Sequence, residues 1–214
     1  MIKGILIDFG GTIDSDGIHW FDAFREAYTL VTDVPKDLLW NAYVNTERTL
    51  GRNPIITPDF TFRQTIQVKI FMHCEYLQSK GVFISDVDQD TILNYCYNKV
   101  VHHISAVSKP VLEKIKLPMV LVTNFYGNMH TVLEEFGLSN LFKDVIESSV
   151  VGVRKPDPEI FRLGVKALGL ESSETIMIGD SEEKDILPAT SIGCHTFKIG
   201  DRPLSHFLKS IGAN

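Results

Sequence analysis

The chain begins with one short apolar run, and from about residue 106 onward short apolar runs alternate with longer amphipathic stretches. The first run, Ile2 to Ile7, stops at Asp8 and a Gly-Gly pair, which predicts a buried strand that delivers Asp8 to its carboxyl end. Further strands are predicted at Met119–Val122, Asp144–Ser148, Ile176–Ile178 and His195–Ile199. Helical patterns separate them, near 111–115, 128–136, 157–168, 182–192 and 204–211. This alternation predicts an α/β fold, a Rossmann-like core with a parallel sheet.

The stretch between these two parts has a different pattern. Its apolar residues recur at helical spacing in four segments, which begin near His19, at Pro35, near Phe62 and near Asp86. An all-helical block that interrupts an α/β pattern after its first strand indicates an inserted domain. We therefore predict a core formed by residues 1–15 and 106–214, and a four-helix cap domain formed by residues 16–105.

Composition narrows the possible functions. The 214 residues are 44% hydrophobic, enough for one substantial core with a smaller accessory domain. The formal net charge of -6 and the lack of a Lys or Arg run argue against a nucleic-acid partner. The three cysteines are scattered, which indicates buried thiols in a reducing cytoplasm. No apolar run reaches signal-peptide or membrane-spanning length, so no membrane partner is expected, and both a monomer and a homodimer are compatible with the sequence.

Polar residues follow the predicted strands where the carboxyl ends of a parallel sheet form a ligand crevice. Three of the predicted strands are followed by a polar residue, namely Asp8, Thr123 and Asp180. Lys155 lies in the loop Gly152 to Pro158. Each residue type also has a structural explanation. Asp8 fits a turn, Thr123 and Asn124 fit a helix cap, Lys155 fits a solvated loop, and the acidic run from Asp180 to Asp185 fits a helix start.

In their order along nearly the whole chain, these motifs resemble those of the haloacid dehalogenase-like hydrolase superfamily. The matching residues are Asp8 with Thr12, then Thr123, then Lys155, then Asp180 with Asp185. The resemblance implies a helical cap after the first motif, a nucleophile at Asp8 and a Mg²⁺ site formed by Asp8, the Gly10 carbonyl, Asp180 and Asp185. It also implies that Lys155 is catalytic and that a small phosphorylated substrate is held by Gly11, Thr12, Thr123, Asn124 and Lys155.

The first motif departs from the family pattern at one position. Phosphatases of this superfamily read Asp-x-Asp-Gly-Thr, and the second Asp is their general acid and base, whereas this chain reads Asp8-Phe9-Gly10-Gly11-Thr12. Gly10 has no side chain to carry a proton, and general acid-base catalysis typically contributes about 10² to 10⁴ in rate. Asp14 fits the acidic position that follows the motif in the family.

Three interpretations follow. The first is a Mg²⁺-dependent phosphatase-type hydrolase that works through an aspartyl-phosphate without the usual acid. The second is a non-catalytic protein that keeps the phosphate and metal site. The third is a phosphonatase-like C–P hydrolase, which would need a Schiff-base lysine from the cap, where Lys36, Lys69, Lys80 and Lys99 are available. A metal-independent dehalogenase fits less well, because the Gly179-Asp180-Ser181 motif resembles the metal-dependent branch.

Overall fold

A parallel sheet brings the ends of its strands to one edge. In the computed structural model, which describes residues 1–210, the five strands lie in the order β3-β2-β1-β4-β5, and every neighbouring pair is parallel. Their bounds are β1 Gly4–Ile7, β2 Met119–Thr123, β3 Asp144–Glu147, β4 Thr175–Gly179 and β5 His195–Lys198. The apolar β1 occupies the middle, because a strand covered on both faces must be apolar throughout. The predicted Rossmann-like α/β fold is confirmed.

The two faces of β1 contribute to different parts of the core. Ile5 and Ile7 point to the face that also packs against the inserted helices, whereas Leu6 points to the opposite face. There α8 (Glu159–Leu168) lies close to the sheet, because Gly164 has no side chain: a Cβ at this position would lie 2.8 Å from Leu6. The other helices of this part are α6 Met129–Glu135, α7 Ser148–Val151, α9 Leu187–Ser191 and α10 Leu204–Ser210.

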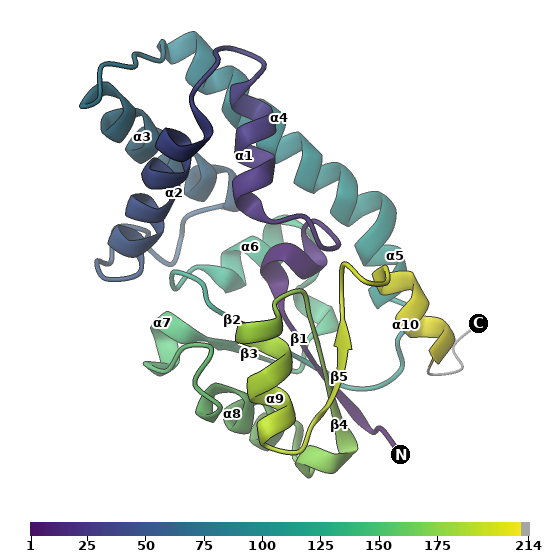
Figure 1. Cartoon of the computed structure of the whole chain (residues 1–214). Coiled ribbons are helices and arrows are strands. Elements are labelled where there is room, and N and C mark those ends of the chain that lie inside the picture. Colours follow the sequence, from purple (N-terminus) through teal and green to yellow (C-terminus); the bar gives the residue numbers. More distant parts are fainter. Residues whose placement is uncertain (211–214) are drawn as a thin grey trace.

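The first four α-helices of the chain follow β1 in the sequence and gather beside the sheet (Figure 1). They are α1 Trp20–Tyr28, α2 Lys36–Leu50, α3 Phe62–Gln78 and α4 Asp86–His103, as the apolar spacing predicts. Thr61 forms a capping box with Gln64 at the start of α3, and Ser85 caps α4. Buried apolar and aromatic side chains join the four helices, including Phe24, Leu39, Ile70 and Ile92.

The end of this helical segment differs from the prediction. The sequence indicates a break near residue 105 and a separate short helix around Val111, but α4 continues through a wider turn at Ile104–Ser108 into α5, Lys109–Leu112. The backbone at both junctions keeps right-handed helical angles. The predicted domain boundary at 105/106 therefore lies inside one continuous helical segment, and the division into two domains stays a prediction.

Polar contacts fasten the inserted helices to the core side near α6. Asn128 Nδ2 donates to the Phe60 carbonyl at 2.8 Å and to Thr65 Oγ1 at 2.9 Å. Tyr97 Oη donates to Glu135 Oε1 at 2.8 Å. The Asn128 contacts therefore hold the start of α3 beside the start of α6, and the Tyr97 contact ties α4 to the end of α6.

Two smaller differences concern the remaining elements. The predicted strand at 144–148 ends at Glu147, because Ser148 begins the short helix α7, which the sequence pattern does not predict. The last predicted helix is present from Leu204, but its expected end at Ile211 lies outside the described residues. None of the helices within residues 1–210 has the length and apolar character needed to cross a membrane.

Candidate active site

Three central strands end side by side and present polar residues to one crevice. Ile7 of β1 pairs with Leu121 of β2 and with Ile178 of β4, so the residues just beyond these positions come together. They are Asp8, Thr123 and Asp180. The Asp8 backbone amide donates to the Ile178 carbonyl at 2.9 Å, which fixes the chain direction where the carboxylate leaves the sheet.

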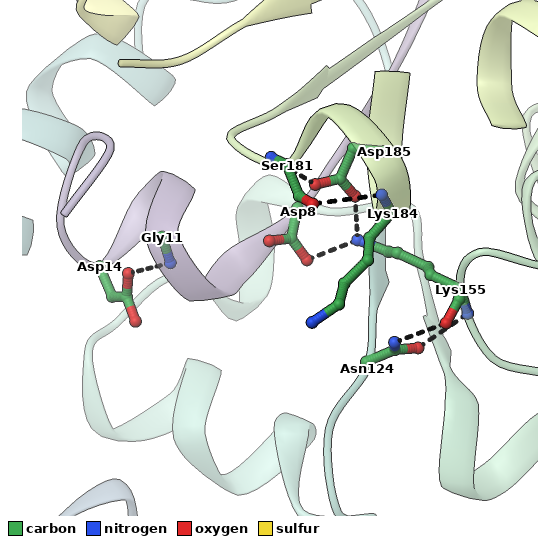
Figure 2. A network of polar contacts seen from close by, with 8 residues as sticks. All are labelled: Asp8, Gly11, Asp14, Asn124, Lys155, Ser181, Lys184 and Asp185. Atoms are coloured by element: carbon green, nitrogen blue, oxygen red, sulfur yellow. Dashed lines mark hydrogen bonds and ion pairs between the residues drawn. The ribbon is translucent and has the colours of Figure 1, made fainter. Parts of the chain in front are cut away.

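Lys155 lies between two of the carboxylates (Figure 2). Its Nζ donates to Asp8 Oδ1 at 2.7 Å and to Asp185 Oδ1 at 2.6 Å. All three residues are at most 6% exposed. A buried ammonium so placed is stable only because two anions surround it, so the three side chains form one interdependent charge cluster.

Asp185 is also held by backbone. The amide of Ser181 donates to Asp185 Oδ2 at 3.1 Å, and the carboxylate lies against Gly179, where a Cβ would be 2.5 Å away. Asp8, Asp180 and Asp185 each offer a carboxylate oxygen, and these three atoms lie within 4.8 Å of one another. The glycine before Asp180 therefore has a packing role that brings Asp185 into the site.

Burial and charge shift the acidity of this cluster. Burial raises the pKa of Asp8 to about 7; Lys155 opposes this shift, and the neighbouring Asp185 and Asp180 increase it. Burial and Asp185 likewise raise the pKa of Asp180. Burial by itself lowers the pKa of Lys155, but Asp185 and Asp8 outweigh it, and the net shift is upward. The site thus concentrates negative charge, which the single ammonium of Lys155 compensates only in part.

The turn after β1 contains two glycines with different reasons for being there. Gly11 has φ +82°, and a Cβ on it would lie 2.3 Å from Asp180 Oδ2, so only glycine fits. Gly10 has φ -75° and ψ 123°, which any residue can adopt, and a Cβ there would meet no atom of residues 1–210 within 4 Å. Neither the backbone nor the packing therefore requires glycine at position 10.

Asp14 lies behind this turn rather than in the cavity. Its carboxylate accepts the Gly11 backbone amide at 2.7 Å and the Trp20 indole Nε1 at 2.6 Å (Figure 2 shows the first contact). Burial raises its pKa to about 6, although these hydrogen bonds lower it. Asp14 therefore ties the turn to the first inserted helix, and does not take the place that Gly10 leaves empty.

Asn124 acts through its side chain, which the sequence analysis did not foresee. Its Nδ2 donates to the Lys155 carbonyl at 3.0 Å, and its Oδ1 accepts the Lys155 amide at 2.9 Å (Figure 2). The residue after β2 thus fixes the backbone from which the Lys155 side chain reaches Asp8. The only sequence signal for this role was an amide two places beyond the predicted strand Met119–Val122.

A cavity of about 340 Å³ opens over these residues. Of the residues predicted from sequence, those that line it are Asp8, Gly10, Gly11, Thr123, Asn124, Lys155, Asp180 and Asp185. Thr12 does not line it: its side chain is fully buried, and its hydroxyl has no hydrogen-bond partner within the described chain. A phosphate-binding role for Thr12 stays a prediction.

The inserted helices supply the opposite wall, which sequence reasoning largely missed. Lys69 of α3 lies 2.8 Å from Glu47 of α2, and the Tyr126 hydroxyl donates to the other oxygen of Glu47 at 2.6 Å. Aromatic side chains, among them Trp20, Tyr43 and Phe62, surround this pair in the cavity wall. Helical spacing places Lys69 on α3 but cannot show which lysine of the insert turns inward.

The donor set of the core wall fits a hard divalent cation. Three carboxylates, those of Asp8, Asp180 and Asp185, cluster here. Gly10 lines the same wall and has a backbone carbonyl as a further oxygen. Such all-oxygen sets are what Mg²⁺ prefers. Counted as ionised, the three carboxylates and Lys155 leave two negative charges in a largely buried space, which a divalent ion would balance.

Comparison with known proteins defines the class of this protein. The family model described as haloacid dehalogenase-like hydrolase matches residues 2–193, and the chain belongs to this family. Among curated relatives, the chain is 42% identical over 67 residues to a glyceraldehyde 3-phosphate phosphatase of Methanocaldococcus jannaschii. This match covers 31% of the chain and 29% of that relative, so the similarity spans only about a third of either protein.

Solved structures of the family share the whole fold. An L-2-haloacid dehalogenase, RSc1362, superposes with a TM-score of 0.64 at 17% identity and 99% coverage of both chains. A putative hydrolase of the family, YfnB from Bacillus subtilis, whose structure is bound to magnesium, gives a TM-score of 0.58 at 18% identity and 98% coverage of both chains. At these identities the likeness concerns the fold alone.

Proposed function

We propose that the protein is a Mg²⁺-dependent phosphatase that transfers the phosphoryl group of a small phosphorylated metabolite first to Asp8 and then to water. One observation carries the proposal: Lys155 joins Asp8 and Asp185 in a buried cluster that faces a cavity of about 340 Å³, with the Asp180 carboxylate adjacent. The family membership and the phosphatase among its relatives support it.

The roles follow from the positions of the side chains. An Asp8 carboxylate oxygen attacks phosphorus, the bond from phosphorus to the leaving oxygen breaks, and an aspartyl-phosphate forms. Water then attacks the phosphorus of this intermediate, which releases inorganic phosphate and regenerates Asp8. Lys155 orients Asp8 and offsets charge on the phosphoryl oxygens. Thr123 and Asn124 line the same cavity, and the Thr123 hydroxyl and the Asn124 backbone amide would donate hydrogen bonds to these oxygens.

The proposed metal ligands are Asp8, the Gly10 carbonyl, Asp180 and Asp185. When bound, Mg²⁺ would neutralise phosphoryl oxygens and help to align the phosphate with the nucleophile. Asp185 has a second task that needs no metal, because it holds the Lys155 ammonium at 2.6 Å.

Because residue 10 is glycine, the site has no carboxyl group at this position to protonate the leaving group. No carboxyl group extends from Gly10 toward the cavity, so an alkoxide would have to take its proton from water. Esters whose leaving group departs without a proton should therefore phosphorylate Asp8 faster than alkyl esters, by up to the 10² to 10⁴ that acid catalysis typically contributes, while the later attack of water on the aspartyl-phosphate proceeds without a carboxylate base at this position for every ester.

The direct test is steady-state hydrolysis of p-nitrophenyl phosphate, because nitrophenolate departs without an acid. We expect Mg²⁺-dependent turnover by wild type and its loss in Asp8→Asn, whereas the exposed control Asp90→Asn keeps wild-type rates. If wild type binds fluoroberyllate and Mg²⁺ but turns over no ester, the non-catalytic phosphate-binding alternative is favoured instead. Turnover that survives in Asp8→Asn contradicts the nucleophile.

A phosphonatase-like C–P hydrolysis is the second candidate, and Lys69 is the observation that favours it. Of the four lysines considered from sequence, Lys69 is the one that lines the cavity. A Schiff base needs the Lys69 nitrogen to attack a carbonyl carbon, however, whereas this nitrogen is held in an ion pair with the Glu47 carboxylate at 2.8 Å. We expect no borohydride-trapped adduct with phosphonoacetaldehyde. A trapped adduct that disappears in Lys69→Gln would reverse this order of preference.

A further inference from the structure

The cavity has a second polar centre, and its bearing on the substrate rests on the proposed function. The core wall holds the groups that would receive a phosphate, so a leaving group must extend toward the inserted helices. That wall is formed by Trp20, Tyr43, Glu47, Phe62, Ile66 and Lys69. A volume of about 340 Å³ lies near the lower end of small-molecule pockets, which leaves room for a short carbon chain between aromatic faces.

Lys69 is the cation of this wall. The residue is 8% exposed, and its Nζ lies 5.0 Å from the centre of the Tyr126 ring and 5.8 Å from that of Trp20. The ammonium has three N–H donors, and its 2.8 Å contact with Glu47 Oε1 is an ion pair without hydrogen-bond geometry. Within residues 1–210 we find no other polar partner of Nζ, so donors remain for a ligand in the cavity.

Glu47 neutralises this cation. Burial raises its pKa, but Lys69 and the Tyr126 hydroxyl outweigh burial, and the net shift is downward, so the carboxylate stays charged. The pair therefore has no net charge but presents a donor and an acceptor close together. A hydroxyl group can use both, and a carbonyl group can use the donor.

We propose that the Lys69–Glu47 pair, braced by Tyr126, selects a short leaving group that carries an uncharged hydroxyl or carbonyl oxygen, and discriminates against a carboxylate. A substrate carboxylate would place a second anion beside Glu47, and the Lys69 ammonium can balance only one of the two charges. In a partly desolvated site, a charge without a counter-ion is costly to bury. The pair acts on specificity and takes no part in phosphoryl transfer.

The test compares two ligands that differ at one carbon: glycerol 3-phosphate, which ends in CH₂OH, and 3-phosphoglycerate, which ends in a carboxylate. Each is used as a competitive inhibitor of p-nitrophenyl phosphate hydrolysis, so slow release of an alkoxide does not affect the readout. We expect wild type to bind glycerol 3-phosphate at least tenfold more tightly. Equal inhibition, tighter binding of 3-phosphoglycerate, or inhibition by neither overturns the proposal, and this comparison needs no variant.

Variants then locate the selectivity. Glu47→Gln leaves the Lys69 charge unmatched and should shift the ratio of the two inhibition constants at least tenfold toward 3-phosphoglycerate. Glu75→Gln, an exposed substitution on the same helix as Lys69, should leave the ratio unchanged. An unchanged ratio in Glu47→Gln contradicts the assignment. Absence of p-nitrophenyl phosphate turnover in wild type would instead contradict the proposed function, so the two failures are distinguishable.

Discussion

The side chain of Asn124 forms two hydrogen bonds with the backbone of Lys155, one to its amide at 2.9 Å and one to its carbonyl at 3.0 Å. The two residues are 31 positions apart and belong to different loops. This pair of bonds sets where the Lys155 side chain starts, and the ammonium then reaches Asp8 at 2.7 Å. The position of the cation therefore depends on an amide that does not touch it.

From this we predict that Asn124→Ala lowers kcat for p-nitrophenyl phosphate by about tenfold or more. Two backbone hydrogen bonds are each worth about 0.5 to 1.5 kcal/mol, and a cation misplaced by about 1 Å can cost much of its effect on the transition state. Asn124→Asp keeps the acceptor for the Lys155 amide, loses only the donor to the Lys155 carbonyl, and should therefore lose less activity than Asn124→Ala.

The matched control is Asn98→Ala, an exposed position on α4, which should behave as wild type. Wild-type kinetics in Asn124→Ala, with Lys155→Ala inactive, would show that the loop contact does not position the cation.

Position 10 yields the second prediction. A Cβ at Gly10 meets no described atom within 4 Å, and its backbone angles suit any residue, so Gly10→Asp should fold normally and point a carboxyl group toward the cavity. We expect phosphate release from alkyl phosphates to rise, by up to about 10² to 10⁴, and by a smaller factor for p-nitrophenyl phosphate, because for that ester only the attack of water on the aspartyl-phosphate gains from the new carboxyl group. Gly10→Asn has the same shape without an acidic proton, and an equal gain in that variant would contradict the explanation.

The neighbouring glycine should respond in the opposite way. At Gly11 a Cβ would lie 2.3 Å from Asp180 Oδ2, and φ is +82°, where an L residue is strained by about 1 to 2 kcal/mol. Gly11→Ala must therefore displace Asp180 or the turn. We predict weaker Mg²⁺ binding, measured by calorimetry, and loss of metal-dependent turnover. Gly10→Ala is the control and should bind Mg²⁺ as wild type does; equal affinity in both variants would contradict a metal site at Asp180.

Much of this arrangement could be predicted from the sequence, because the features concerned are local. Continuous apolar runs marked the strands, and helical spacing marked the inserted helices. The crevice followed from one topological rule, that parallel strands end at the same edge. Asp8, Thr123, Lys155 and Asp180 could be grouped for that reason before any distance was known, and Asp185 joined them through the resemblance to the family.

What could not be predicted depends on packing between segments distant in the sequence. Nothing near Asn124 indicates that its side chain holds Lys155, and nothing near Lys69 distinguishes it from the exposed lysines of the insert. The continuation of α4 into α5 was missed because the residues between them, Ile104–Ser108, have no clear apolar period, and their helical backbone depends on contacts with the core.

The last prediction concerns Asp14, whose carboxylate is 1% exposed and joins Gly11 to Trp20. Burial raises its pKa from the ordinary 3.8 to about 6, so the folded protein binds this proton more tightly than the unfolded chain does. The stability that this protonation contributes is complete below pH 3.8 and disappears as pH rises through about 6, a change on the order of 3 kcal/mol.

In Asp14→Asn this group cannot titrate, and its altered hydrogen bonding should cost a similar amount at every pH. Relative to wild type, we therefore expect the free energy of unfolding of Asp14→Asn to improve between pH 4 and pH 7.5. Urea denaturation at the two pH values measures it, with the exposed Asp90→Asn as control, and parallel pH profiles for wild type and Asp14→Asn would contradict the shifted pKa.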